Sequence, residues 1–335
     1  NTVTQLSDLD SVMSIHPSHR AKNRVFVGLR EGLIVMQRDQ DQWRISDKIK
    51  GINDEIRTIY EEESGVLWLG TKATGVIRVT FVDHDFDSLT SPLKVEKFGK
   101  ADGLPNLNDS WVYPLNQQPS FATRQGIFKF NYDERQFVPD PRFSQLFSEL
   151  RPTWSMKDDP NRGLWLFTQN PHSGAAEIGL AEKLENNKYQ WNAQALQTIV
   201  SSATEGMRQV HLDKDGVVWF GGSEGLYRYD SAVIKHYHFD YPAIIRQVSS
   251  NKRKVIPIEN MKNSTIAYAE NTIRFIYSAP SFDGHDELYF SVKLEGNDDQ
   301  WSDWSAEDYR DYSNLFEGDY RFRVRAKNAY GVVSD

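Results

Sequence analysis

One pattern recurs five times along the chain, and it restricts the possible fold more than any other feature of the sequence. Its clearest copies are GVLWLGTKATGVIRV at 65–79 and GVVWFGGSEGLYRYD at 216–230. Each has a glycine, a strand-like run that contains tryptophan, a short polar turn, a second glycine and a second strand-like run. The position of the tryptophan is occupied in turn by Phe26, Trp68, Ser120, Trp165 and Trp219, at spacings of 42, 52, 45 and 54 residues. Self-similarity at such a period indicates an array of like structural units.

A shorter strand-like stretch precedes each copy, and an acidic or glycine-containing turn joins the two, as in DEIRTIYEEESG at 54–65. With the looser segment that follows each copy, the unit contains about four short strands, which is typical of a β-propeller blade. No unit has an apolar period of about 3.6 over a dozen residues, so a helical solenoid is excluded. The five units occupy about residues 11–234. They form either a five-bladed ring or part of a larger propeller.

The pattern changes after Asp230. Residues 263–335 contain alternating strands separated by turn-rich pieces, such as NTIRFIYSAPSF and DYRFRVRAKNAYG. In the last of these, Tyr320, Phe322, Val324 and Ala326 lie on one face, and Arg321, Arg323, Arg325 and Lys327 lie on the other. We therefore predict an all-β chain with β-propeller repeats at 1–234 and a β-sandwich of the immunoglobulin or fibronectin kind at 235–335.

Composition excludes several classes of protein. The net charge of −8 and the isoelectric point near 5.6 argue against a nucleic-acid-binding surface. The chain has no cysteine, which excludes disulfides, thiolate metal sites and cysteine nucleophiles. No run of 18 or more apolar residues is present, and the first residues lack the features of a signal peptide. The chain begins with Asn1 rather than Met, from which we expect a processed protein or a piece of a longer one.

The repeats, best displayed by DKDGVVWFGGSEGLYRYD, resemble the two-component regulator propeller repeat. The tail, with YFSVKLEGNDDQW and YSNLFEGDYRFRVRAKNAYG, resembles the Y_Y_Y domain that follows such propellers. The resemblance implies the extracytoplasmic, periplasmic sensor region of a bacterial signalling protein. In that family a membrane helix outside this chain joins the sensor to a histidine kinase, a diguanylate cyclase or another output. Ser120 in the tryptophan position and the enlarged turn NPHSGAAEIG depart from the family pattern.

The repeated tryptophans Trp68, Trp165 and Trp219 are expected to pack between blades, because every blade must bury the same face against its neighbour. Ligand-binding residues are better sought where the copies differ. The first strand of each unit should lie nearest the propeller axis, and the side chains there that suit a carbohydrate or an acidic ligand are Arg57, Trp111, Tyr113, Trp154 and Arg208. The alternative is that each of these residues fills the channel or bonds to blade carbonyls.

Other motifs favour structural roles. DKDG at 213–216 predicts a tight turn rather than a calcium loop, because Val217 and Val218 stand where that loop needs a ligand and a glycine. His236 and His238 form at most half of a zinc site. WSDWS at 301–305 copies a motif of cytokine-receptor sandwiches, where arginines stack on the tryptophans, but its position before the final strands favours coincidence. No catalytic residue, metal or cofactor is predicted, because no catalytic or phosphate-binding signature is present.

The sequence therefore predicts a ligand-sensing domain that recognises a carbohydrate or other small ligand and forms a homodimer through the C-terminal sandwich. The basic face of the last strand could meet an acidic partner or remain solvated. Two other classes stay open. One is a propeller-type glycan lyase or hydrolase, which needs two carboxylates, or a tyrosine or histidine with a carboxylate, at the channel mouth. The other is a protein-binding propeller without a small-molecule ligand.

Overall fold

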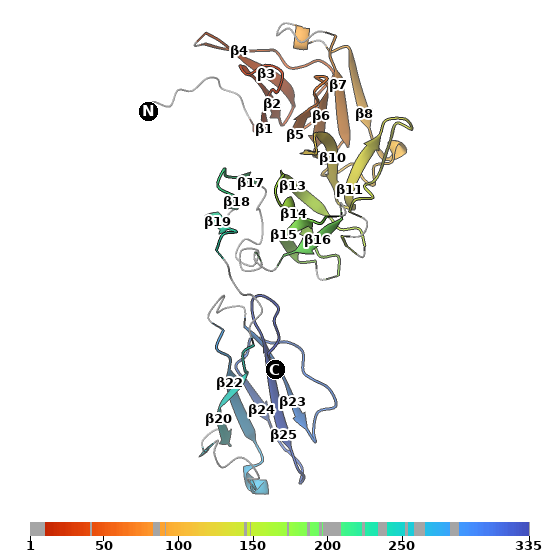
Figure 1. Ribbon diagram of the computed structural model, residues 1–335. Coiled ribbons are helices and arrows are strands. Elements are labelled where there is room, and N and C mark those ends of the chain that lie inside the picture. The colour runs from red at the N-terminus through yellow and green to blue at the C-terminus, as the bar shows by residue number, and fades with distance from the viewer. Residues whose placement is uncertain are drawn as a thin grey trace. The chain divides into compact units, whose positions relative to one another are not determined.

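The fold of the chain is given by a computed structural model (Figure 1). The structure describes residues 11–40, 42–82, 88–90, 92–143, 146–147, 149–172, 174–185, 188–193, 196, 209–222, 225–233, 240–251, 254–257, 265–281 and 288–334. Apart from short 3-10 helices, the regular structure of these residues is entirely β. None of their helices has the length and apolarity needed to cross a membrane. The prediction of an all-β chain is confirmed.

The chain divides into two compact units, of which the first contains Asn1–Ala193 and Ile199–Ser231. This unit is built from five antiparallel sheets in which neighbouring strands follow one another in sequence. The strands are β1 (Val12–Pro17), β2 (Arg24–Leu29), β3 (Gly32–Asp39), β4 (Gln42–Ile45); β5 (Ile56–Glu61), β6 (Leu67–Thr71), β7 (Val76–Thr80), β8 (Lys94–Phe98); β9 (Trp111–Leu115), β10 (Gln118–Thr123), β11 (Gly126–Asn131), β12 (Gln136–Pro139); β13 (Thr153–Asp159), β14 (Gly163–Gln169), β15 (Ala176–Lys183), β16 (Tyr189–Asn192); and β17 (Gln209–Leu212), β18 (Val217–Gly222), β19 (Gly225–Asp230). We call these sheets blades 1 to 5. They follow one another around an arc (Figure 1).

Glycines close the turns between the second and third strands. Gly75 has φ +83°, and a Cβ atom there would lie 2.1 Å from the carbonyl oxygen of Phe98. A side chain is therefore excluded twice, by the left-handed backbone and by the close approach of β8. The repeated glycine of the sequence pattern is explained by this turn geometry.

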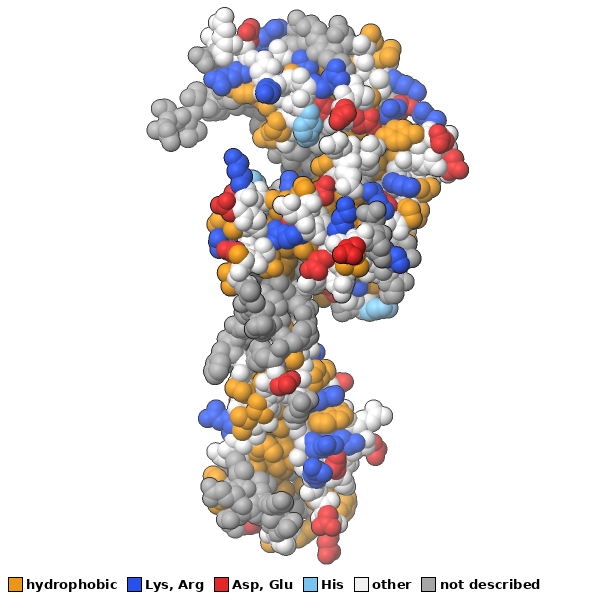
Figure 2. Space-filling view, viewed as in Figure 1, with side chains coloured by type: hydrophobic (Ala, Val, Ile, Leu, Met, Phe, Trp, Pro, Cys, Tyr) orange, Lys and Arg blue, Asp and Glu red, His pale blue; other side chains and the backbone are white. Residues whose placement is uncertain are grey.

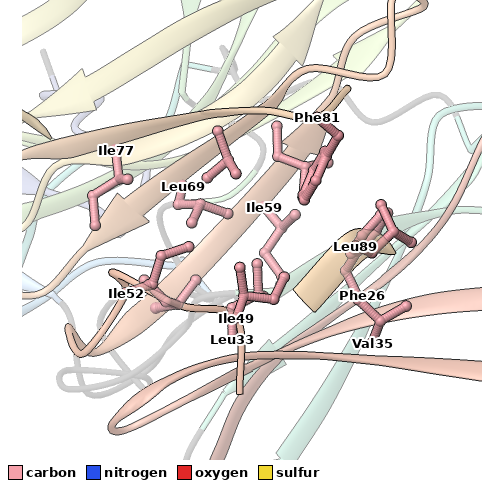
Figure 3. Close-up of a cluster of buried hydrophobic side chains, with 13 residues drawn as sticks. Phe26, Leu33, Val35, Ile49, Ile52, Ile59, Leu69, Ile77, Phe81 and Leu89 are labelled. Carbon is pink, nitrogen blue, oxygen red and sulfur yellow. The ribbon is translucent and has the colours of Figure 1, made fainter. Parts of the chain in front are cut away.

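Blades pack face to face through apolar clusters. Between blades 1 and 2, Phe26, Leu33 and Val35 meet residues of the next blade that include Ile59 and Leu69 (Figure 3). Strand β6 is buried at every position, as expected for a middle strand with a blade on each side. Each middle blade is thus apolar on both faces, unlike the half-exposed sheet of an isolated hairpin.

The tryptophans of the repeat lie in these junctions and face the following blade. Trp68 is fully buried, and its ring centroid lies 5.3 Å from that of Phe121 and 5.1 Å from that of Phe130, both in blade 3. Trp165 contacts Phe220 and Tyr229 of blade 5 in the same way, at 5.5 and 5.6 Å. The prediction that these two tryptophans pack between blades is confirmed.

The corresponding face of blade 5 is more open. Trp219 is only partly buried, and Leu226, whose cross-strand partner is Gly221, is 67% exposed. No residue of β19 is buried, whereas three of the five residues of β7 are. Within the described residues, blade 5 therefore buries the face that meets blade 4 and exposes much of its tryptophan face.

The second unit contains Gln194–Thr198 and Ala232–Asp335. Its strands are β20 (Ile244–Ser250), β21 (Lys254–Ile256), β22 (Ile273–Ser278), β23 (Tyr289–Glu295), β24 (Tyr309–Tyr312) and β25 (Arg321–Lys327). One sheet has the order β21-β20-β22-β24, and β23 pairs with β25 in the other. One cluster between them contains residues of both sheets, among them Val248, Phe275, Val292, Leu294 and Ala326. This is a two-sheet sandwich, and it buries the apolar face of β25 that the sequence pattern predicts.

Candidate functional site

The first strand of each blade forms the inner edge of the first unit. In each sheet the first strand is an edge strand, and β1 contacts β5, β5 contacts β9, β9 contacts β13 and β13 contacts β17. Figure 1 shows the later strands of each blade, such as β8 and β11, toward the outside of the arc. The position predicted for the candidate ligand residues, nearest the axis, agrees with this arrangement.

Three of these inner strands contain a β-bulge at the same place in the repeat. In β1 the pairing passes from Val12 to Ser14, in β5 from Ile56 to Thr58, and in β13 from Thr153 to Ser155. The extra residues are Met13, Arg57 and Trp154. Bulges redirect a side chain and are common beside functional sites. The bulge therefore lies at a position where the sequence copies differ. In blades 2 and 4 that position holds two of the candidate ligand residues, Arg57 and Trp154.

Arg57 has a charged partner two residues earlier. Its guanidinium donates to the carboxylate of Glu55, and the two side chains are 33% and 23% exposed. The pair is therefore accessible at the inner strand of blade 2, and the negative charge of Glu55 balances the positive charge of Arg57.

Tyr113 and Trp154 meet across the junction of blades 3 and 4. The Tyr113 hydroxyl donates to the backbone carbonyl of Trp154 at 3.0 Å. This bond matches the structural alternative for Tyr113, a residue bonded to a blade carbonyl. It also places an aromatic ring beside the bulge of β13.

Trp111 is mostly a junction residue. It is 9% exposed and belongs to a core cluster with Leu115 of its own blade and with Met156 and Leu166 of blade 4. Blade 3 has Ser120 instead of tryptophan in its second strand, and the ring of Trp111 supplies aromatic volume on that face of the sheet, opposite Ala122. The fifth candidate, Arg208, lies outside the described residues.

Charged side chains cluster where the turns of blades 2 and 3 meet. Asp109, just before β9, accepts from Lys72 Nζ at 2.5 Å through Oδ1 and from Arg124 Nη2 at 2.6 Å through Oδ2. Burial alone would raise the pKa of Asp109, but the hydrogen bonds from Lys72 and Arg124 lower it below its ordinary value. Asp109 is therefore ionised, and two cations share one carboxylate.

The acidic residues of the repeat have a role that was not predicted from the sequence. Glu62 Oε1 accepts from the indole nitrogen of Trp68 at 2.6 Å, and Asp159 Oδ2 accepts from that of Trp165 at 3.1 Å. Each acid precedes its tryptophan by six residues, across the turn between the first and second strands. The constant spacing was the available signal, and it identifies these acids as acceptors for a buried indole rather than as catalytic carboxylates.

The described residues offer no obvious metal site, because none of their histidine, aspartate and glutamate side chains form a group of three able to hold an ion. The DKDG segment is a tight turn, with Asp213 N donating to the carbonyl of Val217 and Gly216 N to that of Asp213. The turn prediction is confirmed. His236 and His238 lie outside the described residues.

The basic face of the sandwich is partly covered by tryptophans. The guanidinium of Arg325 lies 4.4 Å from the ring centroid of Trp301 and 4.9 Å from that of Trp304, and Lys327 Nζ lies 4.7 Å from Trp304. Segment 301–305 runs beside β23, with Phe290 and Ser305 bonded to each other in both directions. The interpretation of WSDWS as a coincidence was wrong in one respect, since its tryptophans do stack on cations.

The fold and the inner-strand site together define a chain of propeller blades followed by a sandwich. Comparison with known proteins agrees with this class. Residues 281–335 match the family model of the Y_Y_Y domain. No curated protein matches the chain.

Two solved structures are similar to the chain. One is the extracellular domain assigned to the hybrid two component system BT3049 from B. thetaiotaomicron, with 17% identity, a TM-score of 0.59, and coverage of 97% of this chain and 43% of that one. The other is the extracellular domain assigned to the hybrid two component system BT4673 from the same organism, with 15% identity, a TM-score of 0.41, and coverage of 97% and 49%. The chain spans less than half the length of either. The Y_Y_Y resemblance and the propeller-plus-sandwich fold are confirmed.

Proposed function

We propose that the protein is the ligand-sensing, extracytoplasmic part of a bacterial transmembrane signalling protein. The observation that carries this proposal is the order of its parts, propeller blades and then a Y_Y_Y domain at 281–335, in a fold similar to the extracellular domain of a hybrid two component system. The whole signalling protein would place this part in the periplasm and its output domain, a histidine kinase or another enzyme, across the membrane.

The ligand site is the inner edge of the first unit, and the ligand is a carbohydrate or another small polar molecule. The bulges at Arg57 and Trp154 supply a cation and an aromatic ring from two different blades. Rings and hydrogen-bonding cations are the groups that hold saccharides and small anions in protein sites. Sensing needs binding without turnover. The acids Glu62 and Asp159 are bonded to the blade tryptophans, so we assign them a structural role and not the role of a catalytic pair.

Signalling requires that the ligand prefer one arrangement of the protein. A ligand with about a 100-fold preference shifts the equilibrium between two arrangements by about 2.7 kcal/mol. We propose that the sandwich forms a homodimer and that its geometry carries this shift toward the membrane.

The test is a panel of oligosaccharides measured by calorimetry, with product analysis of the same mixtures. We expect at least one ligand to bind without being cleaved, and Arg57→Gln or Trp154→Ala to weaken that binding about tenfold or more. Lys129→Gln, an exposed change on β11, is the control and should leave affinity unchanged. Cleavage of the bound glycan would contradict a sensor and favour a lyase or hydrolase.

A further inference from the structure

Basic side chains occupy the same turn position in three successive blades. Arg30, Lys72 and Arg124 each follow directly after the second strand of their blade, at the ends of β2, β6 and β10. Because the blades repeat one architecture, equivalent turns lie on the same rim of the first unit. These turns place three cations along one rim of a chain whose net charge is −8. Figure 2 shows acidic and basic side chains interspersed over the visible face of this unit.

Two of these cations are fixed in position by one carboxylate. Asp109 has φ +54°, and its backbone N–H donates to the carbonyl of Lys72 at 2.9 Å, which ties the start of β9 to the turn of blade 2. Its side chain is 9% exposed, whereas those of Lys72 and Arg124 are 46% and 57% exposed. The carboxylate therefore lies beneath the two cationic heads, which face solvent. We call these three residues the Lys72–Arg124 corner.

Among the described residues, Lys72 and Arg124 both pair with Asp109, so the corner has two cations and one carboxylate. Asp54, which bonds to Thr74 in the same turn, is paired with Lys97. The backbone N–H of Lys72 donates to the carbonyl of Glu55, which brings Glu55 close, but the carboxylate of Glu55 is paired with Arg57. Asp109 stays ionised and can offset only one of its two partners. Arg124 directs Nε and Nη2 at the same carboxylate oxygen, so its Nη1 group is left to face other acceptors.

We propose that the Lys72–Arg124 corner binds an oxyanion of the ligand, a carboxylate or a sulfate carried by an acidic saccharide. This inference rests on the proposed function and deepens it by naming the chemistry of the ligand. Guanidinium and ammonium groups held side by side form charge-assisted hydrogen bonds with such anions. The corner adjoins Arg57 through Glu55, so an anion bound there lies beside the inner-strand site.

A second cluster of the same kind provides the control. Glu96 on β8 accepts from Lys94 Nζ at 2.8 Å and from Arg135 Nη2 at 2.5 Å. It too has an exposed lysine head and an exposed arginine head around one carboxylate, but the less exposed Arg78 also pairs with Glu96, at 3.2 Å, and the cluster lies between outer strands of blades 2 and 3. Removing Lys94 and Arg135 changes the net charge of the protein as much as removing Lys72 and Arg124, and it leaves Arg78 paired with Glu96.

The experiment is a calorimetric titration with three probes: an oligogalacturonide, a sulfated oligosaccharide and a neutral oligosaccharide. We expect an acidic probe to bind the wild-type chain and Lys72→Met with Arg124→Gln to weaken it about tenfold or more. Lys94→Met with Arg135→Gln should leave that affinity within about twofold. Preference for the carboxylated or the sulfated probe identifies the source of the oxyanion.

Asp109→Asn gives a test that misfolding cannot imitate. It removes the one negative charge of the corner and keeps an acceptor oxygen for its partners, so the acidic probe should bind more tightly. Equal losses in the two double variants, or weaker binding by Asp109→Asn, would overturn the inference. Binding of only the neutral probe, unchanged in every variant, would also overturn it while leaving the proposed sensing function intact.

Discussion

At the scale of single residues, each buried blade tryptophan needs a packing surface for its ring and an acceptor for its indole nitrogen. The burial of Trp68 and Trp165 follows from their recurrence, because every blade needs the same packing face. The acceptors Glu62 and Asp159 could not be recognised from composition, since acids in turns are usually solvated. Only the turn between the first two strands brings the carboxylate to the indole.

His16, on β1, predicts a pH dependence of stability. Burial and the neighbouring His19 lower the pKa of His16 from 6.5 to about 4. Between these two values the unfolded chain binds more protons than the folded one, so protonation favours unfolding. The stabilising effect is complete above pH 6.5 and is lost as the pH falls toward 4, by up to about 3 kcal/mol.

Urea unfolding at pH 7 and at pH 4.5 measures this effect. His16→Phe should reduce the difference between the two free energies of unfolding, and His211→Gln, at an exposed position of β17, should retain it. An unchanged difference in His16→Phe would mean that other groups control the acid response.

Two glycines allow the energetic cost of backbone strain to be measured separately from the cost of a steric clash. Gly75 and Gly216 have φ +83° and +78°, but only at Gly75 would a Cβ atom meet another group. We expect Gly216→Ala to cost about 1–2 kcal/mol from the left-handed backbone alone, and Gly75→Ala to cost clearly more. Thermal unfolding of the two variants makes the comparison, and equal costs would contradict the close approach of β8.

At the scale of elements, the bulges explain both the success and the limit of the sequence prediction for the site. Arg57 and Trp154 were selected because they break the repeat, and both are the extra residue of a bulged inner strand. The bulge itself could not be predicted, since it depends on a mismatch in residue number between two paired strands. Trp111 shows the opposite case, because the loss of tryptophan at position 120 gives it a packing role that one strand alone does not reveal.

Replacing the repeat tryptophan by alanine should reduce the free energy of unfolding by different amounts in blades 4 and 5. Trp165→Ala removes a buried ring from the junction with blade 5 and should cost about 3–5 kcal/mol. Trp219→Ala removes a partly exposed ring and should cost less than half as much. Chemical denaturation of both variants gives the values, and a similar loss in Trp219→Ala would show that its face is packed in solution.

At the scale of the whole molecule, the two units predict two unfolding transitions. The hydroxyl of Tyr241 lies within hydrogen-bond distance of the carbonyls of Ala326 and Val332, inside the sandwich unit. Tyr241→Phe should cost about 1–2 kcal/mol and lower the Tm of one transition by roughly 4–8 °C or more. Calorimetry should show the other transition unmoved, and a joint shift would mean that the units unfold together.

The repeats predicted the architecture of the first unit because a periodic sequence must satisfy the same contacts in every copy. The number of blades in a complete ring did not follow from it, because ring size depends on the angle between neighbouring sheets and not on the pattern within one sheet. The stacking of Arg325 between Trp301 and Trp304 was missed for a similar reason, since it needs residues from two separate segments.

The tryptophan faces of blades 2 and 4 also give the first unit a direction along the chain. Trp68 and Trp165 each reach forward to aromatic residues of the following blade. A defect at one of these positions therefore loosens the contact with the next blade and spares the contact with the previous one. The junctions are therefore directional along the chain: a substitution at Trp68 or Trp165 acts first on the contact with the blade that follows in sequence, and within the described residues Trp219 of blade 5 is only partly buried.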